Sequence, residues 1–325
     1  MMEIKPSYLR TLSMLGQRGV FGTTLTQLAE QNENIVALAA DLCNTSGLDR
    51  FQKTFPQRFY NTGIAEQNMI GIAAGLASCG KIPFAATFSN FASLRSCEQV
   101  RHFLGYMREN VKLVGFGAGF SFGMFGTTHY ALEDIAALRA INNVIILSPA
   151  DGLTTLKAVE AAAKISAPVY LRLSGTMNNP IVYQQDFDFE IGKAITLRNG
   201  SDIVIMATGS MVYNALKAAE KLEEDDISVK VVDIHTVKPL DVQAVTAACD
   251  AKLIVSVEEH STIGGLGSAI EETMALKSRR PTHLIIGTKP FYPHAGEYAY
   301  MHDVHDLTPE KIALKIKNTY EEICK

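Results

Sequence analysis

Short apolar runs rich in β-branched residues alternate with stretches of helical periodicity along almost the whole chain. Strands separated by helices of about 10–15 residues form βαβ units, which place parallel strands in one sheet with helices on its faces. The alternation therefore predicts an α/β fold. The strands expected in the first half are residues 35–39, 84–88, 111–115, 144–147 and 169–173, and the helices are residues 23–31, 94–108 and 154–164.

The alternation stops once and then resumes. Residues 174–190 contain Gly, Asn, Pro and acidic residues without a helical period, which is typical of a linker. The strands expected after it are residues 203–207, 229–234, 253–257 and 283–286, and the helices are residues 212–222, 242–248 and 266–276. We therefore predict two α/β domains with parallel or mixed sheets, residues 1–175 and 191–325, joined by a linker of residues 176–190.

Composition excludes several classes of protein. With 30 Lys+Arg against 34 Asp+Glu, the chain has no basic excess for binding nucleic acid. The most apolar stretch, residues 113–128, is too short and too rich in Gly to span a bilayer, and charged residues interrupt the first fifteen positions, unlike a signal peptide. The five scattered cysteines form no C-x-x-C pair, which favours a reducing compartment. We expect a cytoplasmic enzyme with neither a nucleic-acid nor a membrane partner.

Two segments follow expected strands at the edge where open α/β sheets bind ligands. In NTGIAEQNMIGIAAGLA (61–77), Glu66 falls in the first turn of a helix, where the helix dipole favours a carboxylate. Local evidence alone favours an ordinary helix-end charge for Glu66. In TFSNF (87–91), Phe88 and Phe91 suit either stacking on a flat heterocycle or simple core packing, and core packing is the commoner role of such a pair.

A third segment, residues 115–130, contains five glycines and ends in Thr127-Thr128-His129. So many glycines after a strand predict a loop with unusual backbone conformations. His129 at its end is suited either to donating a proton or hydrogen bond to a substrate oxygen or to capping the next helix. Composition favours neither of these two roles for His129.

Taken in order, these segments resemble the C-terminal part of a transketolase, a thiamine diphosphate-dependent family. The resemblance covers nearly the whole chain. The motifs that carry it are Ala40-Asp41-Leu42, the 61–77 segment, TFSNF, EQVR (98–101), GTTHYALEDIAALR (126–139), SPADG (148–152) and VEEHSTIGGLGSAI (257–270). They match the family's pyrimidine-binding domain and its small C-terminal domain.

The GDG segment with which the family holds Mg²⁺ and the cofactor's diphosphate does not occur in the sequence. The resemblance therefore implies the C-terminal subunit of a split, two-chain transketolase. Such a subunit supplies the pyrimidine half of each thiamine diphosphate site and needs an N-terminal partner subunit for the diphosphate and Mg²⁺. We expect an α2β2 heterotetramer and no activity from this chain alone, and we expect no metal ligands in this chain.

The resemblance also assigns roles to single residues. It implies that Glu66 hydrogen-bonds a ring nitrogen of the cofactor's aminopyrimidine during transfer of a two-carbon ketol group from a ketose to an aldose. A carboxylic acid donates such a bond only when protonated, and burial between two chains favours that form. The other cofactor-binding residues implied are Phe88, Phe91, Ile64 and Asp41. The substrate-binding residues implied are His129, which is also catalytic, Arg18, Thr45, Ser46 and Arg172.

Three departures from the family's pattern concern the sugar. Met124-Phe125 replaces an acidic pair, Gly117 stands where many members have a histidine, and Tyr130 replaces a glutamine. The phenyl ring of Phe125 cannot accept a hydrogen bond from a substrate hydroxyl. The cofactor residues are retained while these positions differ, so we expect an anionic, atypical sugar that is deoxy, sulfonated or otherwise altered.

Two rival readings stay open at this stage. The β subunit of a 2-oxo acid dehydrogenase shares the architecture and the cofactor, although EQVR and the segment around His129 favour a transketolase. An orphan regulatory partner is the non-enzymatic reading, against which the retained Glu66, Phe88, Phe91 and His129 argue. The glycine run 264–267 before a helix suits an anion, but we expect packing there, and the spacing of His294, His302 and His305 is poor for a metal site.

Overall fold

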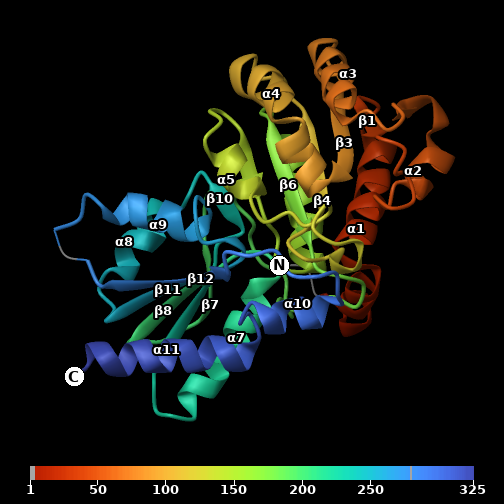
Figure 1. The fold of residues 1–325 in the computed structure, drawn as a ribbon. Helices are drawn as coiled ribbons and strands as arrows, with labels where there is room; N and C mark the ends of the chain where they lie inside the picture. The colour runs from red at the N-terminus through yellow and green to blue at the C-terminus, as the bar shows by residue number, and fades with distance from the viewer. Residues whose placement is uncertain (1–3, 279) are drawn as a thin grey trace.

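Two β-sheets with helices on their faces form the molecule, as the computed structural model of residues 4–278 and 280–325 shows (Figure 1). The first sheet has the strand order β10-β5-β6-β4-β3-β1-β2 and the second β12-β11-β8-β9-β7. Each sheet is parallel except for one antiparallel edge strand, β10 beside β5 and β7 beside β9. The prediction of an α/β fold with two parallel or mixed sheets is confirmed.

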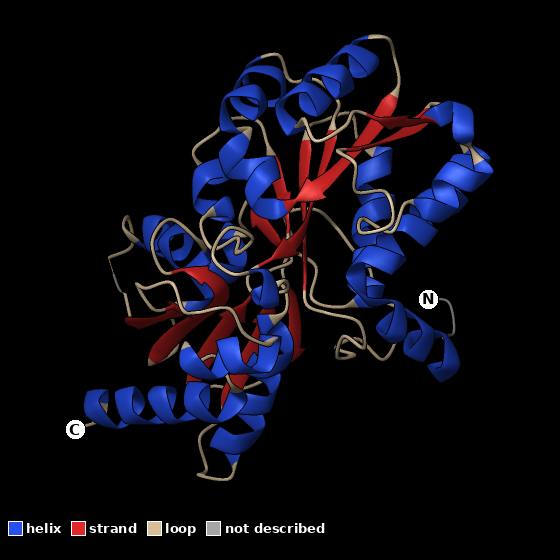
Figure 2. Cartoon of the chain, turned by 45° about the vertical axis from the view of Figure 1, so that its right-hand side comes forward, coloured by secondary structure: helices blue, strands red, loops and turns tan. Residues whose placement is uncertain are grey.

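The strands of the first sheet are β1 (Ile35–Ala39), β2 (Phe59–Asn61), β3 (Ile82–Phe88), β4 (Lys112–Ala118), β5 (Ile145–Leu147), β6 (Val169–Ser174) and β10 (Thr236–Lys238). Its helical segments are α1 (Pro6–Gln31), α2 (Asp49–Thr54), η1 (Pro56–Arg58), α3 (Glu66–Ser78), η2 (Phe91–Arg95), α4 (Cys97–Gln99), η3 (Val100–Tyr106), η4 (Gly123–Phe125), α5 (Asp134–Arg139) and α6 (Gly152–Lys164). Figure 2 shows the strands as a continuous layer between these helices.

The second sheet contains β7 (Ile195–Arg198), β8 (Ile203–Ala207), β9 (Val229–Asp233), β11 (Leu253–Ser261) and β12 (Thr282–Thr288). Its helices are α7 (Met211–Glu223), α8 (Val242–Ala248), α9 (Leu266–Met274), α10 (Tyr298–Val304) and α11 (Pro309–Ile323). Among the residues that the structure describes, no helix is both long enough and apolar enough to cross a membrane.

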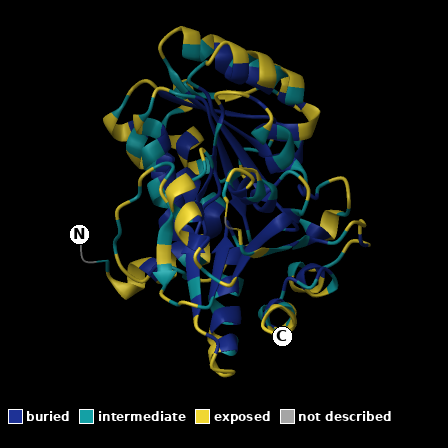
Figure 3. Cartoon of the chain, turned by 90° about the vertical axis from the view of Figure 1, so that its left-hand side faces the viewer, coloured by how far each residue is buried: buried dark blue, intermediate teal, exposed yellow. Residues whose placement is uncertain are grey.

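The central strands are buried on both faces, which explains why their sequences are continuous apolar runs and do not alternate. In β1, Ile35 and Ala37 pack on the side of α1 and α6, while Val36 and Leu38 pack on the side of α3 and η3. Figure 3 shows these strands fully buried beneath helices whose outer faces are exposed. Successive side chains thus serve two separate hydrophobic layers, and helices are required on both faces.

Strand β10 ties the two halves of the chain together. It follows β9 of the second sheet but pairs with β5 of the first, with Thr236 opposite Leu147 and Lys238 opposite Ile146. The Lys238 ammonium donates to the main-chain oxygens of Arg139 and Ile141. No local pattern in residues 236–238 predicts that this strand joins the first sheet. The boundaries of the two domains, residues 1–175 and 191–325, remain a prediction.

The segment between the sheets is docked against both of them, although residues 175–194 form no helix or strand. Asp151 caps α6 by accepting the Thr154 N–H at 2.8 Å, and its second oxygen accepts the N–H groups of Val182 and Tyr183 at 2.9 and 3.0 Å. The Tyr183 hydroxyl donates to Asp233 at 2.6 Å. Burial raises the pKa of Asp233 to about 8, so this carboxyl is neutral at pH 7.

The double role of Asp151 predicts a large loss of stability on substitution. Asp151→Ala removes a helix cap, worth about 1 kcal/mol, and leaves two amides of the segment unpaired, at about 1 kcal/mol or more each. We expect urea unfolding to show a loss of about 3 kcal/mol. Thr308→Ala, which removes the cap of α11 alone, is the matched control and should lose about 1 kcal/mol. Equal losses in the two variants would show that the contacts of Asp151 to residues 182 and 183 contribute nothing.

Candidate active site

An aromatic cup lies at the carboxyl ends of β3 and β4. It consists of Phe88, Phe91, Phe122, Phe125 and His129. The Phe88 ring lies at its centre, edge-on to Phe91 at 5.6 Å, to Phe122 at 5.0 Å and to His129 at 4.9 Å between ring centroids. Gly117 permits this packing, because a Cβ there would lie 2.5 Å from the Phe122 ring. The structure therefore brings Phe88, Phe91 and His129, three of the predicted site residues, together in one place.

Glu66 lies beside the cup as the first residue of α3. Its side chain is only 4% exposed, and its Oε1 accepts a hydrogen bond from Nη1 of Arg95 at 3.0 Å. The Arg95 guanidinium lies over Phe91, with its Cζ 3.6 Å from the ring centroid. Arg95 thus links the buried carboxylate to the aromatic cup.

The sequence analysis did not single out Arg95. Residues 91–95 form the π-helical turn η2, and such turns are frequent at functional sites. This turn allows Phe91 and Arg95 to stack on each other, and Ser93 within it donates back to the Ser89 carbonyl at 2.6 Å. An arginine four residues after an aromatic residue is the only local signal that points to the pair.

His129 is positioned by one polar contact of its own ring and by one at the preceding residue, Thr128. Its Nδ1 lies 2.9 Å from the Thr128 hydroxyl. The Asn90 amide donates to the Thr128 carbonyl at 2.5 Å, which connects the turn after β3 to the residue before His129. Burial first, and the nearby charge of Arg95 second, lower the pKa of His129, so the imidazole is neutral at pH 7. The sequence analysis also missed Asn90, because nothing local distinguishes it from an ordinary turn residue.

Arg18 reaches the rim of the cup from α1. Its Nη1 donates to the Thr45 carbonyl at 2.6 Å, and its Cζ lies 4.9 Å from the centroid of the Phe122 ring. Partial burial lowers the pKa of Arg18, which stays charged. Ser46 is buried, and its hydroxyl donates to the Cys43 carbonyl. Arg18 therefore lies against the main chain of Thr45, while the Ser46 hydroxyl is used within its own turn.

Asp41 and Ile64 lie on the turns that lead to Glu66. Asn61 connects these turns, because its side-chain oxygen accepts the N–H groups of Asp41 and Gly63 at 3.0 and 3.1 Å. Asp41 has a left-handed backbone with φ 57° and accepts the Asn61 amide at 3.1 Å. The Ile64 side chain is 79% exposed, which is unusual for a large aliphatic residue and leaves it free to contact a ligand or another chain.

Arg172 is not part of this group. Its side chain is 1% exposed on β6, and it donates to both oxygens of Asp134 at 2.8 and 3.2 Å. Its Nη2 also donates to the carbonyls of Ala131 and Glu259. The guanidinium is thus committed to contacts between the two halves of the chain, and its position does not support the expected contact with a substrate anion.

The Glu258 carboxylate occupies the start of α9, at the glycine run of residues 264–267. Glu258 accepts the N–H groups of Leu266 and Gly267 at 2.7 and 2.9 Å, so a side chain already occupies this helix start and the run is used for packing.

The described histidines near the C-terminus form no metal site. His305 is stacked between Phe120 and Phe291. In the described part of the chain, no group of three or more His, Cys, Asp or Glu residues is arranged to hold a metal ion.

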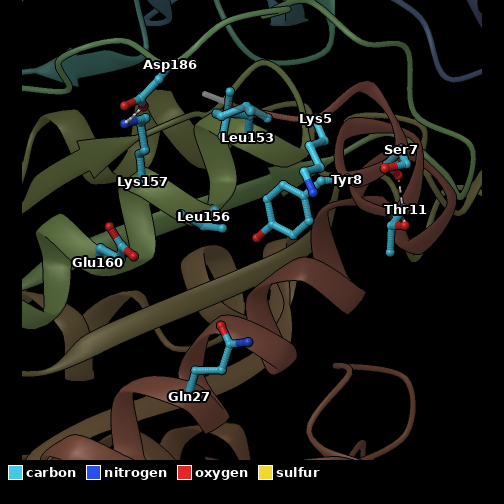
Figure 4. A pocket seen from close by; sticks show the side chains of 11 residues that line it. Lys5, Ser7, Tyr8, Thr11, Gln27, Leu153, Leu156, Lys157, Glu160 and Asp186 are labelled. Carbon is cyan, nitrogen blue, oxygen red and sulfur yellow. Dashed lines mark hydrogen bonds and ion pairs between the residues drawn. The ribbon is translucent and has the colours of Figure 1, made fainter. Parts of the chain in front are cut away.

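A cavity of about 730 Å³ lies apart from the cup, between α1 and α6 (Figure 4). Tyr8 and Leu156 give it an apolar wall, and Lys157 at its edge is paired with Asp186 at 2.6 Å. None of the predicted site residues lines this cavity. The aromatic cup, with its buried carboxylate, is the better candidate for chemistry.

The charge of Arg95 predicts a measurable effect on His129. Replacing Arg95 with Met removes a cation beside the imidazole, so we expect the pKa of His129 to rise toward the ordinary value of about 6.5. NMR titration of the free chain with labelled histidine measures this shift. Arg101→Met, which removes an exposed arginine paired with Glu98, is the control and should leave His129 unchanged. An unaltered His129 titration in Arg95→Met would contradict the electrostatic coupling.

Comparison with known proteins agrees with this geometry. Residues 14–179 match the family model of the transketolase pyrimidine binding domain, and residues 192–312 match that of the transketolase C-terminal domain. The chain is 41% identical over 265 residues to a subunit of the apulose-4-phosphate transketolase of Phocaeicola vulgatus, with 81% of this chain and 85% of that protein covered. It is 38% identical over 298 residues to the 6-deoxy-6-sulfo-D-fructose transketolase subunit SqwH of Clostridium sp., with 91% of each covered.

A solved structure of a split-gene transketolase, an inactive β4 tetramer, matches with a TM-score of 0.83 at 37% identity and covers 94% of this chain and 98% of that chain. The relatives named above are subunits of transketolases, which favours the transketolases over the 2-oxo acid dehydrogenases. This chain belongs to the transketolase family.

Proposed function

We propose that this chain is the C-terminal subunit of a two-chain transketolase, which transfers a two-carbon ketol group from a ketose to an aldose with thiamine diphosphate as cofactor. The observation that carries the proposal is the buried Glu66 carboxylate beside the aromatic cup. The names of two relatives support the proposal, because the proteins from Phocaeicola vulgatus and Clostridium sp. are both named as subunits of transketolases.

The residues around the cup fit the pyrimidine half of thiamine diphosphate. Phe88 and Phe91 offer ring surfaces to a flat heterocycle, and Glu66 offers a buried carboxyl group to a ring nitrogen. Ile64, on the turn before α3, is exposed and apolar, as a side chain that supports the cofactor requires. Asp41 lies on the neighbouring turn. We assign the diphosphate and Mg²⁺ to the partner subunit, since this set is aromatic, apolar and acidic.

When bound, the cofactor supplies an electron sink that stabilises the two-carbon fragment between donor and acceptor. Glu66 donates to the ring nitrogen only as the neutral acid, and in the free chain its Oε1 is occupied by the Arg95 guanidinium at 3.0 Å. Arg95 therefore has to leave Glu66 when the ring binds. Its side chain is half exposed, so it can turn away without disturbing the core.

Two further side chains are assigned to the sugar. His129 is neutral at pH 7, with its Nδ1 engaged by Thr128, so its Nε2 is the atom we assign to a substrate oxygen. Arg18, whose charge is partly buried at the rim, is assigned to the anionic end of the substrate. Thr45, on the adjoining turn, completes the proposed contact, whereas Ser46 is buried with its hydroxyl bound to the Cys43 carbonyl.

The proposal includes an N-terminal partner subunit and an α2β2 heterotetramer. Exposed apolar side chains lie on the segments that carry the site, namely Ile64 before α3, Leu94 in η2, and Met124 and Phe125 in η4, and surface of this kind suits contact with another chain. The related split-gene subunit was solved as an inactive β4 tetramer, which supports self-association without activity for the present chain alone. All five cysteines are free thiols, which suits the reducing cytoplasm.

Glu66→Gln tests the central residue of the proposal. An amide cannot exchange the proton that Glu66 is assigned, so we expect kcat of the assembled enzyme to fall by about 10³-fold or more. The measurement is ketol transfer after co-expression with the N-terminal partner, with the assembly mass determined in parallel. The variant should assemble normally, and Glu98→Gln, a change of an exposed glutamate, should retain full activity. Activity of Glu66→Gln within tenfold of the wild type would overturn the mechanism.

We further propose that the sugar is atypical, being anionic and deoxy, sulfonated or otherwise altered. Phe125 is exposed at the rim of the cup where the family usually has an acidic residue, and Tyr130 is buried with its hydroxyl near the Gly123 carbonyl. Neither residue offers a sugar hydroxyl the contacts of the usual side chains. The relatives named for apulose 4-phosphate and for a sulfonated fructose support this choice.

Steady-state assays of the assembled enzyme test which class of sugar is the preferred substrate. We expect kcat/KM to be higher for a sulfonated or deoxy ketose than for xylulose 5-phosphate, and the reverse order contradicts the proposal. Arg18→Gln should raise KM for an anionic sugar by roughly 10–100-fold, because a charge-assisted hydrogen bond is lost. Arg50→Gln, which changes an exposed arginine on α2, is the control and should leave KM unchanged.

A further inference from the structure

We propose that Glu259, on β11 of the second sheet, is a positioning residue that holds the Gly-rich loop and with it His129 against the aromatic cup. The Gly-rich loop is residues 119–131, between β4 and α5. The inference rests on the proposed function for the role of His129, but the anchoring itself is a property of this chain alone. It gives the C-terminal half of the chain a task in substrate binding.

The Gly-rich loop is closed at its base. Gly119 and Ala131 exchange two main-chain hydrogen bonds, at 3.0 and 3.1 Å. Ser261, at the end of β11, donates its N–H to the Leu132 carbonyl at 2.7 Å. Both ends of the loop therefore lie against the second sheet, and the position of His129 follows from how this base is held.

The Glu259 carboxylate meets the loop at this base. Its side chain is buried, and its Oε1 accepts the Phe120 N–H at 2.7 Å. Gly119 has φ +64°, and a Cβ there would lie 2.3 Å from the Glu259 carboxyl carbon. Only glycine therefore lets the chain approach the carboxylate so closely, which explains why one of the five glycines of residues 115–130 is required.

The other contacts of the Glu259 carboxylate are with residues of the C-terminal half of the chain. Its Oε2 accepts from the hydroxyls of Ser210 at 2.5 Å and Tyr298 at 2.7 Å, and His302 Nε2 lies 3.3 Å from Oε1. Burial by itself raises the pKa of Glu259, but His302, Ser210 and the Phe120 N–H together bring it below the usual value. The anchor is thus an ionised, fully bonded carboxylate whose orientation is fixed from α7 and α10.

The same half of the chain also holds the tip of the loop. Gly296 donates its N–H to the Gly123 carbonyl at 3.2 Å, and the Tyr130 hydroxyl lies 3.4 Å from the His294 carbonyl. The Phe120 ring is stacked on His305 at 4.8 Å between centroids. One face of the loop is therefore fixed by the C-terminal half, while the other presents His129 to Phe88 and Phe91.

The neighbouring glutamate provides a matched control. Because successive side chains of a strand point to opposite faces, Glu258 turns away from the loop and caps α9 through the N–H groups of Leu266 and Gly267. Both glutamates are buried and adjacent on β11. Glu258→Gln therefore perturbs the same sheet without touching the loop.

Hydrogen–deuterium exchange of the full-length chain tests the anchor without the partner subunit. In Glu259→Leu we expect amides of residues 120–129 to exchange about tenfold faster or more, with β4 unchanged. Glu259→Gln, whose amide oxygen still accepts the Phe120 N–H, should restore most of the protection. Glu258→Gln should leave the loop at the wild-type rate even where it lowers the Tm. Wild-type loop exchange in Glu259→Leu, or equal acceleration in Glu258→Gln, overturns the proposal.

Should Glu259→Leu fail to fold, Ser210→Ala and Tyr298→Phe carry the same test, because each removes one bond that orients the carboxylate. In the assembled enzyme we expect the anchor variants to raise KM for the sugar about tenfold, with thiamine diphosphate affinity within twofold of the wild type. An unchanged KM beside a loosened loop overturns the positioning role. If the loop loosens as expected while the wild-type assembly transfers no ketol group, the anchor stands and the proposed function fails.

Discussion

The buried ion pair between Arg172 and Asp134 lies where the two halves of the chain meet and orients a guanidinium that contacts both of them. Both side chains are buried, at 1% and 0% exposure, and the Tyr170 hydroxyl also donates to Asp134 at 2.8 Å. Removing two charges from water is costly, and the cost is offset only where geometry and further hydrogen bonds are good. Here the guanidinium also binds the carbonyls of Ala131 and Glu259, so one side chain connects the sheet, the Gly-rich loop and the second sheet.

Local sequence was enough to place the elements whose pattern is long or strongly apolar. The expected strands 35–39 and 203–207 and the expected helix 242–248 have the bounds that the structure shows. The edge strands β7 and β10 were missed. A strand of three residues such as β10 carries no period of its own, and its partner β5 lies about ninety residues earlier in the sequence. Only the packing of one half against the other creates that pairing.

The residues of the candidate site likewise fall into those that sequence motifs identify and those that only distant contacts define. Glu66, Phe88, Phe91 and His129 lie in ordered motifs near strand ends, so resemblance and topology together identified them, and the structure brings them to one place. The resemblance implied that Arg172 contacts the substrate. Its partner Asp134 is 38 positions away in the sequence, and no local pattern reveals it. Arg95, Asn90 and Glu259 were missed for the same reason, since their roles are defined by partners in other segments.

On the proposed function, the pair between Arg95 and Glu66 gives the half site of the free chain an internal partner for its buried carboxyl group. A buried carboxylate without a partner is costly, and in the free chain Arg95 supplies that partner while stacked on Phe91. On the proposed function, the incoming pyrimidine takes over both contacts, the carboxyl and the ring face. Binding of the cofactor then has to supply the free energy that separates Arg95 from Glu66. Because the partner subunit is assigned the diphosphate end, that free energy is available only in the assembled enzyme, which couples assembly to the formation of a competent Glu66.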